Sequence, residues 1–400
     1  MTLWLIVRRS LRQHVLSTVV TAISIALAGG LLMAVWVVKN QAHATFTGQS
    51  GGWDAVLGAR GAKLQLVLNA IFHLEASPGN LPYQDYEALK TNRAVAAAVP
   101  IAVGDNYRGY RLVGTLTNYF EVEYAPGRRF VVSPGGRMLE DGYREAVVGS
   151  FAAQKLGLKV GSEFQPYHGL NFDPKSQHEE VYVVVGVMEP SNTPADRVIW
   201  IPLAGLQNMS GHDAATAADV SAVLVKLHTP IAGQQLDLLY NRQGNRLTFA
   251  WPIAKQMTDL FEKFGWFDAV LELVAWLVAL VATGAVLASL YNSMNSRRRD
   301  IAILRALGAR RRSIFSAIVL ESATIAALGM VLGFGIYLAI LTGAAAVIRT
   351  QTGVVLDPWQ PAPVWLWAPA AMIGLGALAG IVPAVKAYRA DVAEGLAPES

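Results

Sequence analysis

Side chains of the types that bind metal ions gather in the stretch "YHGLNFDPKSQHEE", residues 167–180. They are His168, Asp173, His178, Glu179 and Glu180. Zinc accepts imidazole nitrogen and carboxylate oxygen as ligands. The spacing matches no specific zinc pattern, and six histidines are an ordinary number for the segment 39–272. We therefore predict a solvated loop and no metal site, with metal binding as the alternative.

The sequence lacks several common catalytic patterns. The sequence has no cysteine, no H-E-x-x-H pattern and no G-x-x-x-x-G-K-[ST] phosphate loop. We expect a non-catalytic protein that binds no cofactor. Any ATP and Mg²⁺ would be bound by a separate chain.

Arginines flank an apolar segment in "RRRDIAILRALGARRRS", residues 297–313, where six of the seven arginines form two triplets. We predict a short helix here, with Asp300 near its start and Gly308 as its C-terminal cap. Its apolar positions form a stripe, in which Leu304 and Leu307 are expected to insert into a partner's groove. The alternative is a loop whose arginines bind anionic lipid headgroups, and the spacing alone leaves both open.

Long apolar runs surround this segment. With 53% hydrophobic and 16% charged residues, the chain has the composition of a membrane protein. Four runs reach or approach the roughly 20 apolar residues that a spanning helix requires. The predicted parts are an interfacial helix (1–14), a first span (15–38), a large domain (39–267), a second span with its stalk (268–294), a coupling segment (295–313), a third span (314–348), a loop (349–363), a fourth span (364–385) and a tail (386–400).

The charge distribution predicts the orientation. The short segments beside the spans carry most of the excess of arginine and lysine, whereas residues 39–272 hold 20 basic and 23 acidic residues. By the positive-inside rule, both termini and the arginine-rich segment are cytoplasmic. The basicity is thus explained by topology, so we expect no nucleic-acid binding. The alternative for the N-terminus, a signal peptide cleaved near Ala44, is disfavoured by an apolar run of 24 residues.

The residue pattern of the large domain predicts an α+β fold. Strands are predicted at 110–115, 179–188, 197–203 and 221–228, and helices at 150–158, 202–209 and 232–241. The parts before and after residue 120 each have their own strands and helices, which suggests two lobes. From Pro252 to Met294 the pattern is continuously helical, so one helix is expected to leave the domain and cross the membrane.

Two features of the spans are candidates for function. Glu321 is the one ionisable residue inside an apolar run, and we favour an ion pair with a nearby arginine over a substrate or proton role. Gly329 with Gly333, and Gly376 with Gly380, form G-x-x-x-G spacings that let helices approach closely. They are expected to serve a dimer, or else to pack spans within one chain.

The arginine-rich segment resembles the hallmark of the FtsX and MacB family of ABC transporter permeases, the mechanotransmission or type VII class. The similarity runs through Arg299, Ile301, Ile303, Leu304, Arg305, Ala306, Leu307, Gly308 and Ala309, with Glu321 downstream. Asp300 stands where many members have Glu. The ending "PAVKAYRADVAEGL" and the domain motifs "APGRRF", "EAVVGSFAAQKLGLKVG" and "VIWIPL" are also similar to the family.

The resemblance implies a multi-pass permease of a bacterial inner membrane, with four transmembrane helices and an α+β periplasmic domain of porter-like and Sabre-like lobes. The arginine-rich segment would be the coupling helix on a cytoplasmic ABC ATPase dimer, beside a second permease copy. The expected function is to move or extract an envelope substrate such as a lipoprotein, peptide or hydrophobic compound, with a periplasmic substrate-binding protein or lipoprotein as a further candidate partner. The alternatives are an FtsX-like regulator of a periplasmic hydrolase and a permease of a zinc-linked envelope system.

Overall fold

The chain forms two compact units. The computed structural model describes residues 3–48, 50–142, 144–211, 218–296 and 298–389. The helical unit comprises Met1–Gln41, Gly265–Ala345 and Asp357–Ser400. The sheet domain comprises Ala42–Phe264 and Ala346–Leu356.

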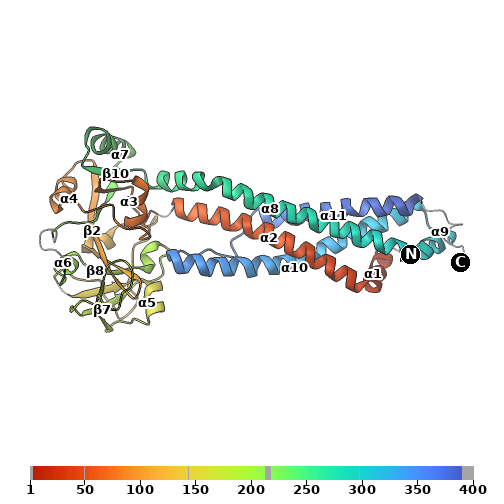
Figure 1. The fold of residues 1–400 in the computed structure, drawn as a ribbon, viewed down its shortest axis with the longest axis horizontal. Helices are drawn as coiled ribbons and strands as arrows, with labels where there is room; N and C mark the ends of the chain where they lie inside the picture. Colours follow the sequence, from red (N-terminus) through yellow and green to blue (C-terminus); the bar gives the residue numbers. More distant parts are fainter. Residues whose placement is uncertain (1–2, 49, 143, 212–217, 297, 390–400) are drawn as a thin grey trace. The chain divides into compact units, whose positions relative to one another are not determined.

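Six helices contribute to the helical unit (Figure 1). They are α1 (Leu3–Gln13), α2 (Val15–Gly48), α8 (Ile253–Ser296), α9 (Arg298–Ala306), α10 (Arg311–Thr352) and α11 (Val364–Arg389). In the described part of the chain, α2, α8, α10 and α11 are long and apolar enough to cross a membrane. The prediction of four spans is therefore confirmed.

Small residues let these four helices pack closely. On α8 the buried positions include Ala275, Ala279 and Ala282, which recur every three or four residues and form one face of the helix. They belong to a core that also contains Ile25 of α2 and Tyr337 of α10. Leu280 and Val281, on the remaining surface of α8, are 63% and 72% exposed, as expected of a helix that faces lipid.

A mixed ten-stranded sheet forms the centre of the sheet domain. Its order is β10-β1-β9-β2-β3-β8-β4-β7-β5, and β6 pairs with β2 off this path. Two neighbouring pairs, β3 with β8 and β4 with β7, are parallel, and the others are antiparallel. The strands are β1 (Ala55–Ala59), β2 (Val95–Tyr107), β3 (Tyr110–Thr115), β4 (Glu145–Val148), β5 (Glu163–Phe164), β6 (Tyr167–His168), β7 (Tyr182–Val187), β8 (Ile199–Pro202), β9 (Ala222–Leu227) and β10 (Leu247–Ala250).

Both faces of this sheet are buried. In β1, Leu57 belongs to one hydrophobic core and Val56 to the other, because successive side chains point to opposite faces. Helices α4 to α7 contribute to the first core, and α3 and the start of α8 contribute to the second. The helices and helical turns are α3 (Lys63–Ala70), α4 (Tyr83–Lys90), η1 (Thr117–Glu121), α5 (Ser150–Leu156), η2 (Pro194–Arg197), α6 (Leu203–Gln207), α7 (Pro230–Asp237) and η3 (Leu238–Gln243).

The four predicted strands and three predicted helices of this domain are confirmed, as β3, β7, β8, β9, α5, α6 and α7. The division into two lobes near residue 120 is not visible in the sheet. The parallel pairing of β3 with β8 joins the two parts, and β9 inserts between β1 and β2. Sheet hydrogen bonds therefore make one continuous layer from both parts.

The last turns of α10 and the loop that follows belong to the sheet domain, which their sequence does not indicate. Val355 N donates to Asn192 Oδ1 at 2.7 Å. The Arg349 guanidinium lies 5.2 Å from the ring centre of Phe151. These contacts attach residues 346–356 to the edge formed by α5 and η2.

Candidate functional site

Helix α9 lies inside the predicted coupling segment and ends at a glycine cap. Gly308 has a φ of +94°. Gly308 N donates to Arg305 O, and Ala309 N donates to Leu304 O, each at 3.0 Å. This is the Schellman arrangement, in which glycine adopts a positive φ with no Cβ strain. The cap stops α9 before α10 begins at Arg311.

The apolar residues of α9 lie on two different faces. Ile301 and Ala302 are buried, and Ile301 packs against α10 and α11. Ile303 is 41% exposed and Leu307 is 80% exposed. Leu304, which lies one turn after Ile301, is half-buried. The docking of Leu304 and Leu307 stays a prediction. The more exposed apolar pair is Ile303 of α9 and Leu307, which directly follows α9 and lies four residues after Ile303.

Basic side chains surround this exposed pair. Arg299, Arg310 and Arg312 are exposed, and Arg305 is half-buried. The Arg311 guanidinium lies 5.7 Å from the ring centre of Tyr388 on α11. The side chains of residues 293–298 and of Asp300 lie outside the described part of the chain, so the first arginine triplet is represented only by Arg299.

Glu321 lies on α10, two to three turns after its start, and is only 4% exposed. Ser10 Oγ of α1 donates a hydrogen bond to Glu321 Oε1. The ion pair of Glu321 with an arginine stays a prediction. Ser10 was not predicted as a partner, because no local pattern links residues 311 positions apart. A buried carboxylate that accepts this bond attaches α1 to the helical unit.

The glycines of α10 face α2 of the same chain. A Cβ added at Gly329 would lie 2.8 Å from Ile25 Cβ and 2.9 Å from Ala22 O. One added at Gly333 would lie 3.2 Å from Ala26 O. These glycines therefore permit close approach of two spans within one chain, which was the alternative to a dimer contact.

The glycines of α11 face α10. A Cβ added at Gly376 would lie 2.6 Å from Ala326 Cβ, and one at Gly380 would clash with the Ser322 side chain. Both G-x-x-x-G spacings are thus used inside the helical unit. They give no support to a second copy of the chain.

Three of the metal-ligating side chains in the sheet domain converge. Asp105 of β2, His168 of β6 and His178 place one ligand atom each within 4.8 Å of one another. Asp105 was not among the candidates from sequence, because only the pairing of β2 with β6 brings it to the histidines. Asp173, Glu179 and Glu180 are not members of this group.

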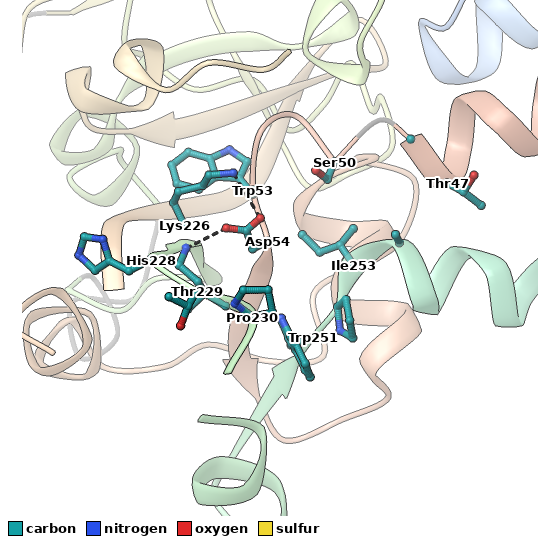
Figure 2. Close-up of a pocket in the computed structure, with 14 residues that line it drawn as sticks. Thr47, Ser50, Trp53, Asp54, Lys226, His228, Thr229, Pro230, Trp251 and Ile253 are labelled. Carbon is teal, nitrogen blue, oxygen red and sulfur yellow. Dashed lines mark hydrogen bonds and ion pairs between the residues drawn. The ribbon is translucent and has the colours of Figure 1, made fainter. Parts of the chain in front are cut away.

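A cavity of about 560 Å³ opens in the sheet domain where α2 ends and α8 begins (Figure 2). Trp53, Trp251 and Pro252 supply apolar walls. Asp54 accepts from Lys226 Nζ at 3.2 Å and from the backbone of Leu227 at 2.8 Å. The charges of Asp54 and Lys226 are thus paired with each other, and the cavity offers mostly apolar surface.

A sequence pattern that is typical of some hydrolases lies beside the same cavity. Residues 48–52 read "GQSGG", which matches G-x-S-x-G, and Ser50 and His228 both line the cavity. In hydrolases with this pattern the serine follows a strand and its base lies within hydrogen-bond reach. Here the motif follows α2, and the described hydrogen bonds do not join Ser50 to His228. Asp54 is paired with Lys226, so among the described residues it does not orient His228.

Comparisons with known proteins address the whole chain. The family model described as MacB-like periplasmic core domain matches residues 15–237, which is more than half of the 400 residues. The model described as FtsX-like permease C-terminal matches residues 272–392. No curated protein matches the chain.

Two solved structures match about half of this chain. The extracellular domain of the noncanonic ABC-type transporter YknZ from Gram-positive bacteria is 18% identical, with 49% of this chain and 99% of that chain covered and a TM-score of 0.32. The periplasmic region of MacB from Actinobacillus actinomycetemcomitans is 14% identical, with 54% of this chain and 94% of that chain covered and a TM-score of 0.36.

Proposed function

Because this chain belongs to the FtsX and MacB family of ABC transporter permeases, we propose that it is the membrane subunit that couples a separate cytoplasmic ATPase to the sheet domain. The family assigns it the role of an ABC transporter permease. The proposed cargo is an envelope substrate such as a lipoprotein, peptide or hydrophobic compound.

The observation that carries the proposal is the exposed side of α9. Ile303 of α9 and Leu307 directly after it expose apolar surface, and the other side of α9 is anchored on α10 and α11. An exposed apolar pair on a short, capped helix suits insertion into a partner's groove. A lipid surface would account for the arginines and could also accept Leu307, so the choice of an ATPase groove rests on the family's partnership with an ABC ATPase.

The proposed orientation follows from charge. Arg8, Arg9 and Arg12 are exposed on α1, and Arg310 and Arg312 are exposed beside α9. Cytoplasmic placement of these residues puts α9 within reach of an ATPase. It puts the sheet domain on the opposite side, in the periplasm of a bacterial inner membrane.

A second permease copy completes the proposal. An ABC ATPase dimer offers two equivalent docking sites, and symmetric assemblies use both. Gly329, Gly333, Gly376 and Gly380 pack against other spans of the same chain, so the proposed contact between copies uses other surfaces of the spans.

Placing negative charges at the two exposed apolar positions tests the docking. In Ile303→Asp/Leu307→Asp, two carboxylates would enter an apolar contact, and we expect loss of copurification with the cognate ATPase and at least a tenfold drop in stimulated ATP turnover. The fold should persist because both positions are exposed.

The matched control is Ile231→Asp, at a 67% exposed apolar position of the sheet domain, which should leave the complex intact. Normal copurification and ATP turnover in the α9 variant would show that α9 is not the docking helix. Ile301→Asp should instead reduce the yield of folded protein, because Ile301 faces the bundle.

A further inference from the structure

We propose that Asp105, His168 and His178 form a binding site for a divalent transition-metal ion of the Zn²⁺ type. This inference stands apart from the docking of an ATPase, because it rests on the sheet domain alone. The site lies on β2 and on the segment that begins with β6.

Strand pairing brings the ligands together. In the antiparallel register of β2 and β6, Asp105 is directly opposite His168. The chain then makes a loop and returns, and His178 N donates to Pro166 O at 2.9 Å. Both histidines are thereby fixed by backbone contacts beside a carboxylate that is fully buried.

The distances from Asp105 to the two histidines match those between two ligands of one zinc ion. Asp105 Oδ1 lies 3.3 Å from His168 Nδ1 and 3.3 Å from His178 Nε2. Strong charge-assisted hydrogen bonds are shorter, at roughly 2.7–2.9 Å. Two ligands that each lie about 2.0–2.1 Å from a tetrahedral zinc ion are separated by about 3.3 Å.

The hydrogen bond on the far side of His178 fixes its tautomer. His178 Nδ1 lies 2.7 Å from Ser210 O, and a carbonyl oxygen only accepts, so Nδ1 carries the proton. The other ring nitrogen, His178 Nε2, faces Asp105 Oδ1. The ring centres of His168 and His178 lie 5.5 Å apart, so one ion can contact both rings.

Further residues hold these ligands in place, as is typical of metal sites. Glu180 accepts from Ser210 N and from Ser210 Oγ, each at 2.9 Å. Glu180 thereby fixes Ser210, whose carbonyl oxygen contacts His178 Nδ1.

Asn106 stabilises the loop between the two histidines. Its Nδ2 donates to Gly169 O at 2.8 Å and to Asn171 O at 3.1 Å, and its side chain is fully buried. The loop is thus built onto β2. His168, with 56% of its side chain exposed, leaves one side of the site open, so we infer that the ion exchanges with solvent and fastens the loop to the sheet when bound.

Zinc titration of the whole protein tests the site. The full chain, purified in detergent and stripped with a chelator, is titrated with Zn²⁺ by calorimetry, with zinc content measured after dialysis. We expect one site per chain, and at least 100-fold weaker binding in His168→Ala and Asp105→Asn. Glu180→Gln should weaken binding by about 10–100-fold through His178.

His228→Ala, which removes an exposed histidine outside the site, is the matched control and should bind zinc normally. The exposed position of His168 makes loss of fold an implausible cause in His168→Ala, and an unchanged circular dichroism spectrum checks this. Wild-type protein with no stoichiometric site, or equal zinc affinity of wild type and His168→Ala, would overturn the proposal.

Hydrogen exchange gives a second readout of the role assigned to the metal. Zinc should slow amide exchange of residues 166–178 in wild type and leave it unchanged in His168→Ala. Stoichiometric zinc binding without added protection would refute the fastening role. Ile303→Asp/Leu307→Asp should bind zinc as wild type does, so failure of the docking proposal and failure of this one are distinguishable.

Discussion

His73 is held uncharged inside the sheet domain. The residue is 7% exposed, and its ring meets Trp200 edge-on at 5.7 Å. Burial, followed by the positive charges of Arg111 and Arg197, lowers the pKa of His73 from its ordinary 6.5 to about 3. Its φ is +54°, a left-handed conformation that histidine and asparagine tolerate better than most residues.

This lowered pKa predicts acid sensitivity. Above pH 6.5 the imidazole is neutral in both states, and the full stability is present. As the pH falls from 6.5 toward 3, His73 binds a proton in the unfolded chain but stays neutral in the folded chain. The free energy of unfolding therefore decreases. The loss reaches about 2 kcal/mol at pH 5, which His73→Asn should largely remove.

Unfolding curves of the detergent-solubilised chain between pH 5 and 7.5 measure this effect. Asparagine suits the left-handed backbone, so the comparison isolates the charge. His228→Asn, at an exposed position, should keep the slope of the wild type. An unaltered pH slope in His73→Asn would mean that His73 is not the acid-sensitive group.

At the scale of helices, glycine position decides how closely the spans approach. Gly329 and Gly335 both lie on α10. Gly329 faces α2, whereas a Cβ at Gly335 would meet nothing within 4 Å. The same contrast exists on α11 between Gly376 and Gly374.

Gly329→Ala should therefore destabilise the helical unit by about 1–3 kcal/mol, because α2 must move away. Gly335→Ala should be neutral or stabilise by up to about 1 kcal/mol, since alanine favours the helix. Thermal unfolding in detergent compares the two. Equal melting temperatures of the two variants would contradict the assigned contact between α2 and α10. An effect of Gly329→Ala on dimerisation alone would instead support a role of this glycine in a dimer contact.

At the scale of the whole molecule, α8 is one helix of 44 residues that has residues in both units. Its two glycines, Gly265 and Gly284, lie in open space and do not interrupt it. An unbroken helix is stiff along its axis, so we propose it as the element through which ATP-driven motion passes between α9 and the sheet domain.

A flexible break should uncouple the two ends of α8. Insertion of Gly-Gly-Gly after Phe267 is expected to leave ATPase assembly intact while substrate movement fails, because glycine weakens only the helix. An Ala-Ala-Ala insertion changes length and phase equally but preserves the helix, and it should retain more transport. Transport assays in proteoliposomes compare them, and full transport with the glycine insertion would move the coupling path to another span.

The sequence by itself determined the class of this protein. Apolar run lengths set the four spans, the arginine-rich motif identified the family, and alternating apolar residues located β3, β7, β8 and β9. These features are local: they depend on residues close in the chain, whose periodicity reports the surface that each element buries. The cap at Gly308 is local in the same way.

Only the tertiary structure decided which residues meet. Strand β2 was not predicted from the sequence, because it is rich in alanine and contains Pro100. In the sheet it nevertheless lies between β9 and β3. Its pairing with β6 put Asp105 beside His168, and packing of α9 on α10 and α11 turned Ile301 inward and left Leu307 outside. Such contacts depend on strand register and helix packing between residues far apart in the chain, which no local pattern encodes.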